Sequence, residues 1–521
     1  MTKFFNYYNS LCVGVNTPNV FTFDPYFNAV KEFFMIEIKQ IIYYMEKLKE
    51  LSVDTSKYRD KVIDFISIII TNLDFSRENF FLIVEDLYQN KIKIKNEYIE
   101  ISKSKNIEYT LLNEKETDLS TEEKIIKLLN EYEQNSNKKK EIPQNIKSLF
   151  AIATSLILNA CNSLSELKEY NYNFTEAKDE ILKLFNTSTY DLENEEEIKN
   201  KIIEFAKCNY KITKKLNEKI IEKYGKIKRK TVDYKTKKGK CILVSGNNLN
   251  DLEKILQATK NTNINVYTHD AMINAFKYES FEKYENLIGH YQNSENLFSI
   301  DFATFPGAIY ISKNSLPQID IIRGQIYTSA KNPAFGIGKI INDDFTDLIK
   351  YSEKQKGFLL DKTLKAITIG YTKEILKKEV ETLKEKIKNN EIKNIYLFGH
   401  LNKTIQKTEN IKQEINKLSK EDYIISFGYN TERKNVWNAN PFYDFEMLYD
   451  LIETLKKEIK NIEEKIKITI TDCNNETIST IFNLKSLGIK EIYLGECCPN
   501  IINPTIINGL KQMFNIKELK D

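Results

Sequence analysis

The sequence has few of the residues that usually build metal centres. Its 521 residues include seven cysteines, three histidines and one tryptophan. The cysteines are dispersed, their number is odd and no pair is spaced as C-x-x-C, so neither a disulfide framework nor a zinc ribbon is expected. Such cysteine usage is typical of a reducing compartment, and no basic-then-apolar leader opens the chain. We therefore expect a cytoplasmic protein.

Neither sign of charge is in excess. The 77 basic and 74 acidic residues leave a formal net charge of +3, whereas nucleic-acid-binding proteins usually carry a clear basic excess. Arginine, the usual residue for bidentate phosphate binding, occurs only at positions 59, 77, 229, 323 and 433. The longest apolar stretches, such as Phe65–Thr71, are far shorter than the ~20 residues of a membrane-spanning helix. We expect no nucleic-acid partner and no membrane partner.

What the chain does contain is enough apolar sequence for several cores. Hydrophobic residues make up 41% and aromatic residues 12% of the chain, which excludes disorder as its main state, and its length suggests about three domains. Residues 1–235 are expected to form a helical domain of two bundles. The polar stretch of about 103–140 is expected to be an exposed linker or a loosely held helix. Apolar residues at a period near 3.6 predict helices over Phe27–Leu51, Tyr58–Asn72, Arg77–Gln89, Ile146–Tyr170, Asn173–Phe185 and Glu195–Tyr224.

The pattern changes near residue 237 to short apolar runs separated by helical segments, which is typical of parallel α/β sheets. We expect one α/β domain over 236–372 and a second over 373–521. The predicted strands are Lys240–Ser245, Asn263–Thr268, Gly307–Ser312, Gln325–Ser329, Lys365–Gly370, Asn394–Phe398, Asp422–Ser426, Lys467–Thr471 and Glu491–Leu494. Ligands of such sheets bind beyond the carboxyl ends of the strands, yet these loops carry no standard nucleotide-binding signature.

Several sequence segments at the predicted strand ends resemble those of the hybrid cluster proteins, also called hydroxylamine reductases. They are Cys241–Leu252 (CILVSGNNLNDL), Asn263–Ala275, Phe305–Leu316, Ile326–Ser329 and Leu484–Gly495, with Thr71–Phe81 in the helical half. The resemblance covers nearly the whole chain in order. It implies two three-helix bundles followed by two Rossmann-like domains. It also implies an iron–sulfur cluster near the N-terminus and a hybrid iron–sulfur–oxygen cluster held by one His, two Glu and four Cys.

The chain departs from the family at every ligand position of that hybrid cluster. The V-S-G-H-D-L and T-H-G-E-M motifs have Asn247 and Ala271 in place of their His and Glu. The T-N-C-L, G-G-C-D-G, A-C-G-K and G-Q-C-N motifs have Ser315, His400, Phe427 and Ala439 in place of their cysteines, and Asn474 replaces the Glu of W-Y-E-Q-K. The N-terminal four-cysteine motif is also missing, and Cys12 stands alone there. Because iron–sulfur clusters need thiolate ligands, we expect neither cluster and no cofactor.

Two alternatives concern the same strand ends. His269, Asp270, His400, Cys473 and Glu476 could in principle form a replacement zinc site, although ordinary polar loop residues are the simpler interpretation. The adjacent Cys497 and Cys498 make a poor chelate. We interpret them as structural thiols, and Cys161, Cys208 and Cys241 as core residues.

Three functional hypotheses follow. The first is a non-catalytic homologue that serves as a scaffold or assembly subunit, binding a protein partner or its own copies. The second is an enzyme or small-molecule binder with an iron-free cavity lined by Asn247, Ser315, His400, Cys473, Asn474 and Glu476. The third, and least expected, is a true hydroxylamine or nitric oxide reductase.

Overall fold

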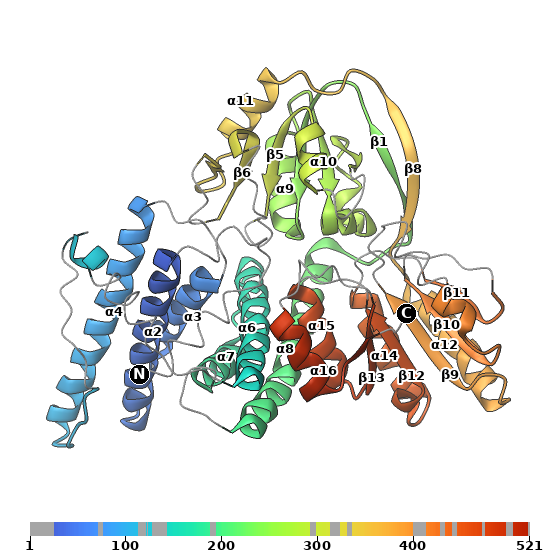
Figure 1. Cartoon of the computed structure of the whole chain (residues 1–521). Coiled ribbons are helices and arrows are strands. Elements are labelled where there is room, and N and C mark those ends of the chain that lie inside the picture. The colour runs from blue at the N-terminus through green and yellow to red at the C-terminus, as the bar shows by residue number, and fades with distance from the viewer. Residues whose placement is uncertain are drawn as a thin grey trace.

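A helical region is followed by two parallel α/β sheets (Figure 1). The expected fold class, a helical region followed by two parallel α/β domains, is thereby confirmed. The computed structural model describes residues 25–70, 77–112, 121, 123–127, 143–187, 194–291, 298–312, 323–330, 336–399, 413–427, 433–439, 445–470, 475–495 and 504–518.

The six long helices described in the helical region form two groups of three. In the first, α2 (Pro25–Glu50) packs against both α3 (Ser56–Ile70) and α4 (Arg77–Ser104); in the second, α6 (Gln144–Glu169) packs against α7 (Thr175–Thr187) and α8 (Glu195–Tyr224). The predicted helices are confirmed, although α4 continues to Ser104 instead of ending near Gln89. Most of the expected linker of about 103–140 lies outside the described residues.

The first sheet has strand order β4-β3-β2-β5-β6-β7, all parallel. Its central strand β2 is the apolar run predicted from the sequence, buried along five of its six residues. The strands are β2 (Lys240–Ser245), β3 (Ile264–His269), β4 (Leu287–His290), β5 (Ala308–Ile311), β6 (Ile326–Thr328) and β7 (Gly338–Lys339), and the helical segments are α9 (Leu249–Ala258), η1 (Asp270–Lys277), η2 (Glu279–Phe281), α10 (Phe298–Thr304), η3 (Arg323–Gln325) and α11 (Thr346–Lys354).

The prediction that Lys365–Gly370 is a strand of this parallel sheet is wrong. These residues belong to β8 (Lys362–Ile369), which pairs antiparallel with β1 (Lys230–Thr236) in a separate two-stranded ribbon. Only one face of the ribbon is buried, where Val232, Tyr234 and Ile369 pack against Ile273. A short apolar run does not by itself distinguish a half-buried antiparallel strand from a buried parallel one.

The second sheet has strand order β11-β10-β9-β12-β13-β14, again parallel. Its strands are β9 (Asn394–Gly399), β10 (Asp422–Ser426), β11 (Val436–Asn438), β12 (Ile466–Ile470), β13 (Glu491–Leu494) and β14 (Lys517–Glu518), and its helical segments are α12 (Lys373–Lys388), α14 (Phe445–Glu458), η4 (Ile462–Glu464), α15 (Asn475–Ser486) and α16 (Pro504–Phe514).

The second sheet and the helical region share one hydrophobic core. Helices α15 and α16 pack against α6 (Figure 1), closely enough that a Cβ on Gly509 would lie 2.7 Å from the Ser148 Cβ. Asn209 of α8 donates to Asn483 of α15 at 2.8 Å. Helix α6 is long and apolar enough to cross a bilayer, but 72% of its most apolar window is buried. Such burial is typical of a helix in a protein core.

Candidate site at the strand ends and the domain junction

The loops after β2 and β3 leave the same edge of the first sheet. The two strands pair in parallel with Ser245 opposite His269, so Asn247 and Ala271 each follow the paired strand ends by two residues. The end of β5 lies beside them, because the backbone N–H of Ser312 donates to the Ser245 carbonyl at 3.0 Å. The sequence-based placement of these two positions at one sheet edge is therefore correct.

The loop after β2 is organised as a helix start. Gly246 has φ of 117°, a left-handed conformation that favours glycine. Asn248 is the N-cap of α9, and its side-chain oxygen accepts from the backbone N–H groups of Asn250 at 2.9 Å and Asp251 at 3.2 Å. Asn247 is half-buried between them. The tight turn and the cap thus fix the backbone on both sides of Asn247, where the resemblance implies a histidine.

In the loop after β3, Asp270 has a left-handed backbone and Ala271 offers no side-chain ligand atom. Asp270 has φ of 58°, a conformation that few residues other than glycine, asparagine and aspartate adopt readily. The T-H-G-E-M motif has glycine at this position. Ala271, which follows it at the position of the family's glutamate, is half-buried and carries only a methyl group. It therefore has no atom that could bind a metal.

Behind these loops, Ser245, His269 and Asp301 form a fully buried polar set. The Ser245 Oγ lies 2.8 Å from the His269 Nδ1, and the His269 Nε2 lies 3.5 Å from an Asp301 carboxylate oxygen. Burial lowers the pKa of His269, although Asp301 opposes this shift. The residue types are those of a nucleophilic triad, but their exposed fractions of 0–3% leave a substrate no approach to Ser245. The set instead ties β2 to β3 and α10.

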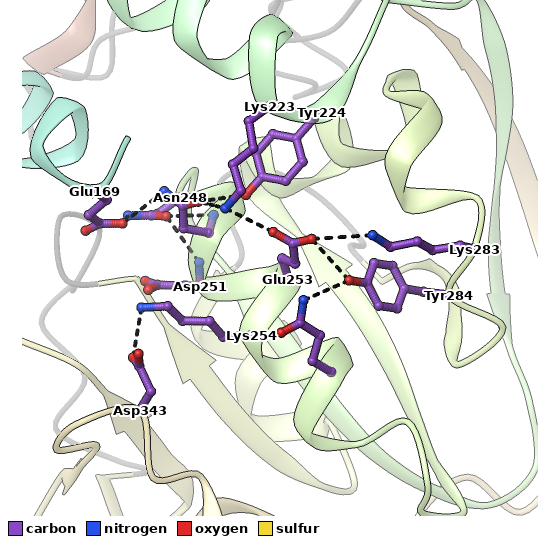
Figure 2. Close-up of polar contacts among 12 residues, drawn as sticks. Glu169, Lys223, Tyr224, Asn248, Asp251, Glu253, Lys254, Lys283, Tyr284 and Asp343 are labelled. Carbon is purple, nitrogen blue, oxygen red and sulfur yellow. Dashed lines mark hydrogen bonds and ion pairs between the residues drawn. The ribbon is translucent and has the colours of Figure 1, made fainter. Parts of the chain in front are cut away.

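A polar network joins the same edge to the helical region (Figure 2). Glu169, at the end of α6, accepts from the side-chain amides of both Asn248 and Asn250 at 3.1 Å. From the end of α8, Tyr224 donates to Asn250 Oδ1 at 2.8 Å, and the ammonium of Lys223 bonds to the same oxygen. The start of α9 is thereby held against the ends of two helices from the other part of the chain.

Charged side chains continue the network along α9. The Lys223 Nζ lies 3.0 Å from a Glu253 carboxylate oxygen, and Tyr284 donates to Glu253 at 3.2 Å (Figure 2). Burial alone would raise the pKa of Glu253, but these two partners and Lys283 lower it. A separate buried pair joins the two α/β parts, with Lys277 of η1 lying 3.2 Å from Glu446 of α14. Hydrogen bonds and ion pairs therefore hold α9 against α8, and η1 against α14.

Two of the corresponding positions of the second sheet, Phe427 and Ala439, are described, and both are apolar and buried. Phe427 directly follows β10 and is 2% exposed, and Ala439 directly follows β11 and is 3% exposed. The N–H of Phe427 donates to the Phe398 carbonyl at 2.8 Å and that of Ala439 to the Ser426 carbonyl at 2.9 Å, so both lie at the carboxyl edge. Both belong to the large hydrophobic core.

Several predicted positions lie outside the described residues. Within the part of the chain that the structure describes, no group of three or more His, Cys, Asp or Glu side chains is arranged to hold a metal ion. The replacement zinc set remains a prediction, because of its five members only His269 and Asp270 have described side chains. The residues outside the description are Cys12, Ser315, His400, Cys473, Asn474, Cys497 and Cys498, and the side chain of Glu476.

The three described cysteines are placed as core residues. Cys161 lies within α6, Cys208 lies within α8, and Cys241 lies near the amino end of β2, away from the ligand loops. Burial raises the pKa of Cys208 and Cys241 to about 12, and it raises that of Cys161 as well. Such thiols stay protonated at neutral pH and are poor metal ligands.

A protein-family model and a solved structure are similar to this chain. Residues 28–428 match the model of the Prismane/CO dehydrogenase family. The chain belongs to this family. Among solved structures it is similar, at 10% identity and a TM-score of 0.48, to the one titled "NiZn[Fe4S4] and NiNi[Fe4S4] clusters in closed and open alpha subunits of acetyl-CoA synthase/carbon monoxide dehydrogenase", over 95% of this chain and 80% of that one.

The described residues do not fit the hybrid cluster of this family. Ala271 and Ala439 carry methyl groups, Phe427 carries an aromatic ring, and Asn247 carries an amide, so none supplies the thiolate, carboxylate or imidazole that the resemblance implies at its position. The Asn248 cap could have been found from the sequence, because Asn followed three residues later by Asp is a helix-start signal. No sequence signal pointed to Glu169, Lys223 or Asp301, which come from distant helices.

Proposed function

We propose that this chain is a cluster-free member of the family that acts as a scaffold or assembly subunit, without redox catalysis. The observation that carries the proposal is the burial of Phe427 and Ala439 at two of the family's ligand positions. An aromatic ring and a methyl group in a closed apolar core leave no thiolate for iron and remove polar groups from the site. A cytoplasmic location is part of this proposal, because it agrees with the unpaired, protonated state of the three cysteines that the structure describes.

The ordered loops after β2 and β3 also support the proposal. The loops after β2 and β3 have a glycine turn, an asparagine cap and a left-handed Asp270, with a buried polar set behind them. These features stabilise the strand ends and the start of α9. A chain that needs its shape, but not the chemistry of its relatives, would keep these features and lose the ligands.

Two measurements test the proposed function together. With a reduced viologen dye as electron donor, the anaerobically purified protein should show no hydroxylamine or nitric oxide reduction above the dye-only rate. Light scattering and electron microscopy should show a defined oligomer or a stoichiometric co-purifying protein. Turnover, or a strict monomer that co-purifies with no partner, would contradict the proposal.

The small-molecule alternative remains a hypothesis. Of the six side chains that were expected to line its cavity, only Asn247 is among the described ones. A thermal-shift screen in which a hit is abolished by His400→Ala would favour this alternative over the scaffold.

A further inference from the structure

The end of the β1–β8 ribbon combines exposed leucines with lysines. We define the ribbon tip as residues 236–240 and 356–364, which pair through Thr236 with Lys362 and Gly239 with Phe358. Three leucines of the tip are among the most exposed large apolar side chains described: Leu359 at 71%, Leu360 at 64% and Leu364 at 68%. Apolar side chains gathered in this way usually mark an interaction surface.

The same tip is basic. It contains five lysines and one acidic residue, Asp361. Lys240 is half-buried and bonds to the Gln355 carbonyl, and Asp361 accepts from the backbone N–H of Lys238 at 2.6 Å. The remaining lysines, at positions 237, 238, 356 and 362, are exposed. A partner of the tip must therefore accept both positive charge and apolar side chains.

The ribbon is poorly suited to pairing with another strand or a second copy of itself. Tyr234 is paired with Lys365 and Lys235 with Thr363, so the register skips Leu364, which forms a bulge on β8. Bulges and lysines on an edge strand are devices that prevent strand addition. Two copies of the tip would also bring like charges together. Strand pairing and self-association at this face are thus disfavoured.

We propose that the ribbon tip docks on a membrane surface rich in anionic phospholipid headgroups. Leu359 and Leu360 would enter the headgroup boundary while Lys237, Lys238, Lys356 and Lys362 meet the phosphates, as in other basic and apolar surface anchors. The expectation of no membrane partner concerned segments that span a bilayer, and the one described helix apolar enough to do so, α6, is mostly buried. Peripheral docking needs no such segment. The inference is independent of the proposed scaffold function.

Vesicle co-sedimentation of the full-length protein tests the proposal. The protein should sediment with vesicles of 70% phosphatidylcholine and 30% phosphatidylglycerol, but not with pure phosphatidylcholine, and 0.5 M NaCl should release it. Because each lysine at an anionic surface contributes about fivefold in affinity, the variant Lys237→Glu/Lys238→Glu should lose at least about tenfold. Leu359→Ser/Leu360→Ser should lose a similar factor while keeping the preference for anionic lipid.

Matched variants separate the tip from general charge and hydrophobicity. Lys377 and Lys378 are an exposed pair on α12, and Leu82 is 64% exposed on α4. Lys377→Glu/Lys378→Glu and Leu82→Ser should therefore sediment like the unmodified protein, with every variant melting at the same temperature. Absence of vesicle binding, or equal losses in tip and control variants, would overturn the proposal. Binding to soluble polyglutamate without vesicle binding would also overturn it, in favour of an acidic protein partner.

Discussion

The Ser245 Oγ and the His269 Nδ1 lie 2.8 Å apart at the ends of two paired strands, with neither side chain more than 3% exposed. Asn247 follows Ser245 by two residues, and Ala271 follows His269 by two residues. The buried contact thus lies beside two of the positions that the resemblance assigns to cluster ligands. Because the contact needs no metal, its role can be tested by stability measurements.

Replacing His269 by alanine should destabilise the protein strongly. The substitution leaves a cavity and removes the hydrogen-bonding partner of the buried Ser245, and such losses cost about 2–4 kcal/mol. Urea denaturation at pH 7.5 measures the loss. A change below about 0.5 kcal/mol, the range of ordinary surface substitutions, would show that the set does not hold the strands together.

The same histidine should make stability depend on pH. Its pKa in the folded protein lies below the ordinary value of 6.5 because it is buried. The unfolded chain therefore binds the proton more readily, so stability is full above pH 6.5 and falls as the pH drops through that value. The free energy of unfolding of the wild type should decline between pH 7 and 5. The decline should be shallower in His269→Gln, and parallel curves for the two proteins would contradict this account.

Glu169 should stabilise the junction between the helical region and the first sheet. Glu169→Ala removes the acceptor of both the Asn248 and the Asn250 amide, with an expected cost of about 1–3 kcal/mol. Lys168, its neighbour on α6, is 38% exposed in its pair with Asp64. Lys168→Ala should therefore cost less than about 1 kcal/mol. Equal effects of the two substitutions in thermal denaturation would argue against a junction at Glu169.

Phe427 should behave as a core residue. Phe427→Ala is expected to cost about 3–5 kcal/mol, as for other buried aromatic side chains. The exposed Leu82 provides the comparison, since Leu82→Ala should change stability by less than about 0.5 kcal/mol. A neutral or stabilising Phe427→Ala would mean that the ring borders an open cavity, which would favour a ligand site.

The three described cysteines should resist alkylation in the folded protein. With a pKa of about 12, Cys208 and Cys241 are almost entirely protonated at pH 8, and Cys161 is shifted in the same direction. Peptide mass spectrometry after iodoacetamide treatment should find these three unmodified until urea is added. Rapid labelling of Cys241 under native conditions would contradict its placement in the core.

Sequence reasoning recovered the elements whose signal is local. The predicted bounds of β2, β10 and β13 agree with the structure, because each is a continuous apolar run bounded by polar residues. Strands β7 and β14 have two residues each and are defined by their pairing partners, so no sequence window reveals them. The antiparallel partner of β8 was missed for a related reason, since β1 precedes it by more than 120 residues.

The same distinction applies to the candidate site. Asn247, Ala271, Phe427 and Ala439 were placed at strand ends from the motifs around them, and the structure places them there. The contacts of Glu169 with Asn248 and of His269 with Asp301 depend on how distant elements pack, which spacing along the chain does not encode.

Iron and acid-labile sulfide analysis of the anaerobically purified, full-length protein tests the central claim most directly. The account predicts less than about one-tenth of an iron atom and as little sulfide per chain, because the family's thiolate positions are occupied by other side chains. It also predicts no broad absorption near 400 nm. Stoichiometric iron and sulfide that survive gel filtration would contradict the account.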